Sequence, residues 1–198
     1  YIPLIGFSCL MWGNDNTSAN WFASDISRAT DWQFFITDQA RKQLEHTVKQ
    51  AFAPDRLLFD YKKDDFDLGP GFETIATAAN KAYFERGFTL IRGLPRNNMT
   101  ESEFELLIWA IGLHLGVARP QGKFSNYISE VRATGMNYRS AHGRGYNSNA
   151  GLDFHCDGCD LVALGCYNKA KSGGQSLITS SISAWKTLNE ERPDLAET

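Results

Sequence analysis

The sequence has few cysteines, almost no excess of charge and no long apolar run, and each shortage argues against a class of protein. Four cysteines in 198 residues are too few for a disulfide scaffold. The formal net charge is −3, without the basic patch that favours nucleic acid or the charge run that favours a disordered tail. The apolar stretch 1–12 lacks a preceding basic region and is too short to cross a bilayer. We therefore expect neither a nucleic-acid partner nor a membrane partner.

The residues that are present predict a globular body. Hydrophobic residues make up 42% of the chain and aromatic residues 13%, enough to bury a sizeable core. A chain of this length is ordinarily one domain. The cysteines are not spaced as a disulfide framework, which favours a reducing compartment, and we expect a cytoplasmic location.

Three amphipathic helices are predicted in the first 120 residues. Thr37 can cap a helix over 38–53, and a second helix over 72–86 ends at Gly87. The sequence Thr100-Glu-Ser-Glu103 is a capping box that opens a third. The apolar stripes of the three helices are Ala40, Leu44, Val48 and Ala51 or Phe52, then Ile75, Ala79, Ala82 and Tyr83, then Phe104, Leu107, Ile108, Ile111 and Leu115.

Shorter elements connect these helices. Residues 88–92 read as a short strand. The acidic stretch 60–71, with its Gly and Pro residues, reads as a linker or surface loop. The apolar run 161–167 and the stretch 176–180 are predicted as strands separated by a turn of small residues, and Cys166 is then a core residue. Helices followed by strands predict an α+β arrangement.

Metal-binding chemistry is concentrated in the sequence Phe154-His-Cys-Asp157. In an extended strand alternate side chains share a face, so His155 and Asp157 would project together, away from Cys156. One imidazole and one carboxylate supply two of the three ligands of a facial triad that leaves positions open on Fe(II). The third ligand, a second histidine, must come from elsewhere.

These residues resemble the taurine dioxygenase-like (TauD/TfdA-like) Fe(II)/2-oxoglutarate dioxygenases. The resemblance extends over residues 72–198, and the stretches that carry it are 87–95, 154–157, 170–176, 180–181 and 192–195. It implies a double-stranded β-helix, or jelly roll, of which this chain holds the first part. It also implies Fe(II), 2-oxoglutarate and O2, with succinate and CO2 released as a small organic molecule is oxidised.

Roles for single residues follow from the resemblance. His155 and Asp157 would be the metal ligands and catalytic residues, and Ser176 would hydrogen-bond a carboxylate of 2-oxoglutarate. The middle residue of the motif, usually Thr, is Cys156 here. Residues just before the motif lie near the substrate in the family, which points to Tyr146, Asn147 and Asn149. The implied division is an N-terminal helix-containing subdomain or extension, 1–71, and the N-terminal part of a dioxygenase domain, 72–198.

Two features of the family are absent from the sequence. The distal histidine ligand and an arginine for 2-oxoglutarate lie well beyond the motif in the family, whereas His46, His114 and His142 all precede it. We expect the chain to be a fragment. The alternatives are that the remaining C-terminal part is supplied separately, or that the protein is an inactive dioxygenase-fold binding or scaffold protein. The sequence leaves open whether the protein forms a homo-oligomer. A weaker alternative is a zinc module that uses His155, Cys156 and Cys159.

Overall fold

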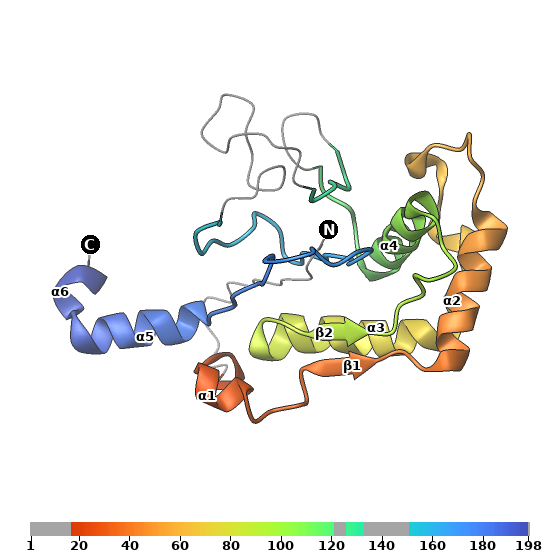
Figure 1. Ribbon diagram of the computed structural model, residues 1–198. Coiled ribbons are helices and arrows are strands. Elements are labelled where there is room, and N and C mark those ends of the chain that lie inside the picture. The colour runs from red at the N-terminus through yellow and green to blue at the C-terminus, as the bar shows by residue number, and fades with distance from the viewer. Residues whose placement is uncertain (1–16, 121–125, 133–150, 198) are drawn as a thin grey trace.

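The computed structural model describes residues 17–120, 126–132 and 151–197 (Figure 1). Three longer helices and a two-stranded sheet pack together between residues 33 and 115, and we call this unit the helical body. The elements in chain order are η1 (Thr17–Ala19), α1 (Ala23–Ile26), β1 (Gln33–Phe35), α2 (Asp38–Ala51), η2 (Leu58–Asp60), η3 (Lys63–Asp65), α3 (Gly69–Lys81), η4 (Ala82–Arg86), β2 (Leu90–Arg92), α4 (Glu101–Leu115), α5 (Ser181–Glu191) and α6 (Pro193–Ala196).

Helix α2 forms as its sequence predicts. The Thr37 hydroxyl accepts a hydrogen bond from the backbone N–H of Ala40, which satisfies one of the donors left open at a helix start. Leu44 and Val48 are fully buried toward α3 and α4. Gly71 of α3 approaches closely, since a Cβ there would lie 3.0 Å from the Leu44 side chain. The predicted cap and apolar stripe are therefore confirmed.

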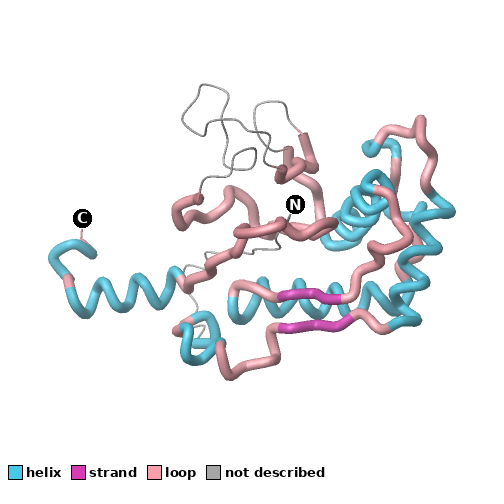
Figure 2. The backbone as a smooth tube through the Cα atoms, viewed as in Figure 1, coloured by secondary structure: helices cyan, strands magenta, loops and turns pink. Residues whose placement is uncertain are grey.

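Helix α3 continues into the π-helical turn η4 and ends at Gly87, the residue predicted to end it. Gly87 has φ 83°, a left-handed conformation that glycine adopts without a steric penalty. Strand β2 follows and pairs in parallel with β1, with Gln33 opposite Leu90 and Phe35 opposite Arg92. The connection between the two parallel strands contains α2 and α3, and the sheet lies along α3 (Figure 2).

Helix α4 begins with the predicted capping box. The backbone N–H of Thr100 donates to the Glu103 carboxylate at 2.7 Å, and the backbone N–H of Glu103 donates to the Thr100 hydroxyl at 3.2 Å. Its buried side chains extend beyond one stripe, because α4 contacts α2, α3 and the η3 region together. They are Phe104, Leu106, Leu107, Trp109, Ala110 and Ile111.

The stretch 60–71 is wrongly predicted as a linker or surface loop. Tyr61, Phe66 and Leu68 are buried in the core of the helical body. The Tyr61 hydroxyl accepts a hydrogen bond from the backbone N–H of Ala53 at 2.9 Å. The acidic neighbours are exposed to water, while tight turns direct the three apolar side chains into the core. The acidic composition of the stretch therefore gave no indication that it contributes to the core.

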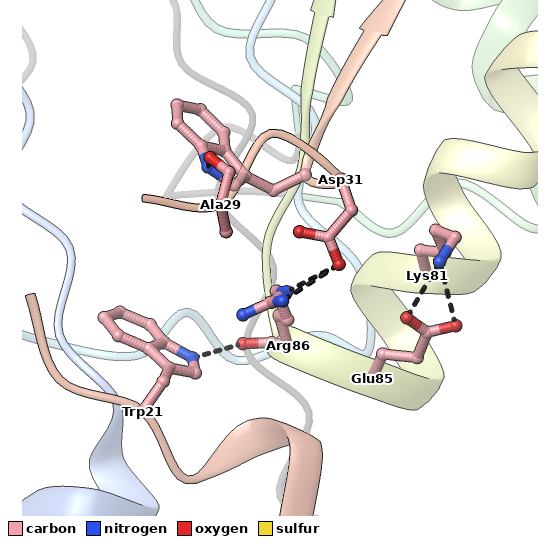
Figure 3. A network of polar contacts seen from close by, with 7 residues as sticks. Trp21, Ala29, Asp31, Lys81, Glu85 and Arg86 are labelled. Atoms are coloured by element: carbon pink, nitrogen blue, oxygen red, sulfur yellow. Dashed lines mark hydrogen bonds and ion pairs between the residues drawn. The ribbon is translucent and has the colours of Figure 1, made fainter. Parts of the chain in front are cut away.

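A polar network joins the segment before β1 to η4, the turn that follows α3 (Figure 3). The indole N–H of Trp21 donates to the carbonyl of Arg86 at 2.9 Å, and the Arg86 guanidinium pairs with the Asp31 carboxylate at 2.9 Å. On the same face, Lys81 pairs with Glu85 one turn away. The Arg86 hydrogen bond holds the pKa of Asp31 below its usual range.

Helices α5 and α6 extend away from the helical body (Figure 1). Helix α5 is held at its first turn, where the Ser180 hydroxyl accepts from the backbone N–H of Ser183 and donates to the carbonyl of Ala19. The Ser183 hydroxyl lies 2.8 Å from the carbonyl of Trp21. The helix is therefore tied to the N-terminal segment through two buried serines.

The strands predicted at 161–167 and 176–180 are absent, and that prediction is wrong for the described residues. A strand requires a neighbouring strand for its backbone hydrogen bonds, and no described segment pairs with these two. Cys166 is correspondingly exposed rather than buried in a core strand. The jelly roll stays a prediction, since the described strands are only β1 and β2.

Within the described ranges, no helix is both long enough and apolar enough to span a membrane.

Candidate metal and co-substrate site

His155 lies in a segment without helix or strand, residues 151–179, which we call the site segment. Its side chain is exposed, and its Nδ1 lies 2.7 Å from the carbonyl oxygen of Asp153. A carbonyl can only accept, so the contact favours the tautomer with the proton on Nδ1. That tautomer leaves the lone pair of Nε2 available, as a metal-ligating imidazole requires.

Asp157 is also exposed and lies two residues further along the same segment. The predicted strand that would project it beside His155 is not formed here, so the alternation of faces does not apply. The described part of the chain contains no group of three or more His, Cys, Asp or Glu side chains placed to hold one metal ion. The structure thus presents His155 and Asp157 as neighbours in sequence and brings no third described ligand to them.

The environment of Cys159 disfavours it as a metal ligand. Cys156 is exposed and Cys159 is half-buried, and both are free cysteines. Burial raises the pKa of the Cys159 thiol, and the nearby Asp157 carboxylate raises it further. Metals bind the thiolate, so this environment disfavours the ligand form. The predicted zinc alternative of His155, Cys156 and Cys159 is not assembled among the described residues.

Ser176 follows a turn built by two glycines. Gly173 has φ 72° and Gly174 has φ 74°, so two consecutive residues have the left-handed backbone conformation. Residues with a Cβ rarely adopt this conformation. The turn explains why two glycines precede Ser176 in the sequence. The Ser176 side chain is exposed, and its hydroxyl is available to a carboxylate ligand.

The predicted substrate residues lie outside the described residues. Tyr146, Asn147 and Asn149 all belong to the range 133–150, as does His142. Of the other histidines, His46 is exposed on α2 and His114 packs against Phe72 with ring centroids 5.1 Å apart. Neither is placed with His155 in a metal-binding group.

Sequence reasoning missed three residues that attach the site segment to the helical body: Arg96, Gly165 and Tyr167. Gly165 carried a usable signal, because an isolated glycine inside an apolar run indicates a close backbone approach. Arg96 carried none, since its partners lie about seventy residues away in sequence and only the folded chain brings them together.

Comparison with known proteins gives consistent matches. The family model described as "Taurine catabolism dioxygenase TauD, TfdA family" matches residues 53–198. The FR-33289 synthase of Streptomyces rubellomurinus is 25% identical over 176 residues, which cover 88% of this chain and 52% of that protein. A taurine hydroxylase-like protein of Stachybotrys chartarum is 27% identical over 139 residues, covering 66% of this chain and 35% of that protein. The chain thus spans about half or less of the length of these curated relatives.

Proposed function

Because the chain belongs to the taurine catabolism dioxygenase TauD, TfdA family, we propose that it works as an Fe(II)- and 2-oxoglutarate-dependent dioxygenase. Its substrate would be a small organic molecule that is oxidised, most simply by hydroxylation. Two observations support the proposal: the family match covers the His155–Asp157 motif, and the contact of His155 Nδ1 with the Asp153 carbonyl favours the tautomer that leaves Nε2 available to a metal. The family also implies a jelly-roll dioxygenase fold.

The donor set of the motif fits Fe(II). His155 would offer Nε2, with its ring oriented by the carbonyl of Asp153, and Asp157 would offer a carboxylate oxygen. A facial triad needs a third protein ligand, and none is assigned here. Bound iron would supply the redox chemistry that consumes O2 and 2-oxoglutarate and releases succinate and CO2.

The other residues would bind and orient the reactants. The exposed Ser176 hydroxyl would donate a hydrogen bond to a carboxylate of 2-oxoglutarate. Tyr146, Asn147 and Asn149 are retained as proposed substrate contacts. The names of the two relatives, a synthase and a hydroxylase-like protein, agree with a small-molecule substrate. The division into an N-terminal helix-containing subdomain or extension, 1–71, and the N-terminal part of a dioxygenase domain, 72–198, stays a proposal, and α2 and β1 of the first part share the core of the helical body with α3, α4 and β2, which lie wholly or mostly in the second.

The test is an anaerobic Fe(II) titration of the intact protein with 2-oxoglutarate, followed by visible absorption. A chelated Fe(II)–2-oxoacid complex gives a weak charge-transfer band, which we expect in the wild type. Replacement of either ligand, His155→Ala or Asp157→Ala, should abolish the band and the iron-dependent turnover, because two remaining protein ligands do not hold the metal well.

The matched control is His46→Ala, which removes an exposed imidazole from α2. It should leave the band unchanged. Near-normal turnover in Asp157→Ala would contradict the assignment of ligands. Absence of the band from the intact wild type would instead favour the alternative, an inactive binding or scaffold protein of the same family.

A further inference from the structure

Arg96 lies in the loop between β2 and α4 and reaches across to the site segment. Its Nε donates to the backbone carbonyl of Tyr167 at 2.8 Å, and its Nη2 donates to the side-chain oxygen of Asn168. The guanidinium also lies over the Tyr167 ring, with Cζ 4.7 Å from the ring centroid. One arginine therefore makes two hydrogen bonds and a stacking contact with two consecutive residues, a combination for which its planar fork is suited.

Tyr167 completes the attachment from its own side. Its hydroxyl donates to the carbonyl of Met99 at 2.9 Å, just before α4 begins. Its ring packs against Phe104 in the first turns of α4, with ring centroids 5.5 Å apart. Both ends of this side chain are thus engaged, the polar tip by the backbone and the ring by Phe104 and Arg96.

Gly165 allows the backbone to come this close to α4. The residue is buried, and a Cβ at this position would lie 2.4 Å from Cδ1 of Ile108 and 2.7 Å from its Cγ1. The same Cβ would lie 3.2 Å from Cε1 of Phe104. A side chain at residue 165 would therefore push the site segment off the helix or displace Ile108.

We propose that Arg96, Gly165, Tyr167 and Asn168 form a clasp that positions the two halves of the metal and co-substrate site. The inference rests on the proposed function. His155 and Asp157 precede the clasp in the site segment, and Ser176 follows it, beyond the Gly173–Gly174 turn. The clasp fixes the site segment to the helical body between these two parts. It therefore determines where the stretch that carries His155 and Asp157 and the stretch that carries Ser176 lie relative to the body. Its members are positioning residues, since their contacts are with one another and with the helical body rather than with His155, Asp157 or Ser176.

The test compares two exposed arginines of the intact protein. Arg96→Ala removes the clasp contacts. The matched control, Arg92→Ala, removes an arginine from β2 whose Nε donates to the Gln33 side chain at 3.1 Å and does not touch the site segment. A third variant, Tyr167→Phe, keeps the ring and removes only the hydroxyl that bonds to Met99. Urea denaturation of all three variants is the check that each is folded.

Two measurements are made on each variant. Amide hydrogen exchange of the metal-free protein should be at least several-fold faster over 161–168 in Arg96→Ala than in Arg92→Ala. The Fe(II) concentration for half-maximal charge-transfer absorption should rise about tenfold in Arg96→Ala, as for residues that orient metal ligands from outside the ligand shell. Tyr167→Phe should give a smaller change in the same direction, and Arg92→Ala should match the wild type.

The outcomes separate this inference from the proposed function. If the wild type gives no charge-transfer band, the proposed function fails and the positioning of a metal site fails with it. Exchange then decides only whether the clasp fixes the site segment to the helical body: faster exchange in Arg96→Ala supports the attachment, and equal exchange overturns it. If the wild type gives the band, the Fe(II) concentration for half-maximal absorption decides on the positioning role. An unchanged concentration in Arg96→Ala overturns that role, even if amide exchange in this variant is faster.

Discussion

The helical body and the site segment differ in where their side chains lie. In the body, Leu44 and Leu107 are fully buried, and each long helix begins or ends at an identified cap. In the site segment, Phe154 is 66% exposed and Leu177 is 78% exposed, without helix or strand. Of these two regions, the one with less apolar burial thus carries the candidate chemistry, and a few contacts with the body hold it in place.

The difference follows from the range of the interactions. A helix forms its backbone hydrogen bonds within a few residues, so Thr37 or Thr100 can determine where it begins. A strand takes its hydrogen bonds from another segment, and none of the described segments supplies them to 161–167 or 176–180. Segments of low local stability are also those in which binding residues are commonly found.

The largest expected effect tests this contrast directly. Leu44→Ala in α2 should lower the free energy of unfolding by about 2–5 kcal/mol, because the side chain is fully buried and its removal leaves a cavity beneath α3. The same truncation in the site segment, Leu177→Ala, should change it by less than about 0.5 kcal/mol, because that leucine is already in water. Urea denaturation of the intact protein measures both.

Equal losses from the two leucine variants would contradict the contrast. A large loss from Leu177→Ala would mean that this leucine is covered in the intact protein. A small loss from Leu44→Ala would mean that the core is not centred on α2. In either case the helical body would no longer be the part of the protein that determines its stability.

The helical body could be predicted from the sequence because its signals are local. The Thr100 capping box, the Gly87 stop and the stripe that includes Leu44 each lie within one helix and its flanking residues. The stretch 60–71 was misread for the converse reason. Its acidic composition dominates the local pattern, whereas Phe66 and its apolar neighbours are buried by packing against helices distant in sequence.

The candidate site was predictable in its chemistry and not in its arrangement. A histidine and an aspartate two residues apart indicate metal binding, and the Gly173–Gly174 turn before Ser176 follows from glycine's conformational freedom. Of the clasp, only the close approach at Gly165 has a local signal in the sequence. The pairing of Arg96 with Tyr167 and Asn168 could not be predicted, because these partners lie about seventy residues away and one of the bonds is to a backbone carbonyl, which any residue at position 167 would present. The predicted substrate residues lie outside the described ranges.

A comparison of two helix caps sharpens the same contrast at smaller energies. Thr100→Ala should lower the free energy of unfolding by about 1 kcal/mol, because α4 belongs to the core and its first turn loses an acceptor. Ser180→Ala also removes a cap, together with the donor to the Ala19 carbonyl. Because α5 extends away from the body, we expect faster amide exchange in α5 and a smaller change in global stability.

Conservative replacements provide the controls for the caps. Thr100→Ser keeps a hydroxyl at the start of α4 and should restore most of the lost stability, and Ser180→Thr should do the same for exchange in α5. If Ser180→Ala destabilises the whole protein as much as Thr100→Ala does, α5 unfolds together with the helical body. That result would contradict the expectation that α5 opens independently of the body.

The smallest expected effect depends on pH and concerns the pair of Asp31 and Arg86. The pKa of Asp31 is lowered in the folded protein, first by the hydrogen bond from Arg86, so the pair stabilises the fold when the carboxylate is charged. This stability is present above the ordinary aspartate pKa of about 3.9 and is lost as the pH falls through the lowered value. Asp31 is about half exposed, so Asp31→Asn should cost less than about 1 kcal/mol at neutral pH.

The measurement is the difference in free energy of unfolding between wild type and Asp31→Asn across the acidic range. The difference should shrink toward zero as the pH falls below about 3.9, while Asp64→Asn, which replaces an exposed aspartate, should follow the wild type throughout. A difference independent of pH would mean that the carboxylate charge contributes nothing. The tie between the N-terminal segment and α3 would then rest on the hydrogen bond from the Trp21 indole to the carbonyl of Arg86.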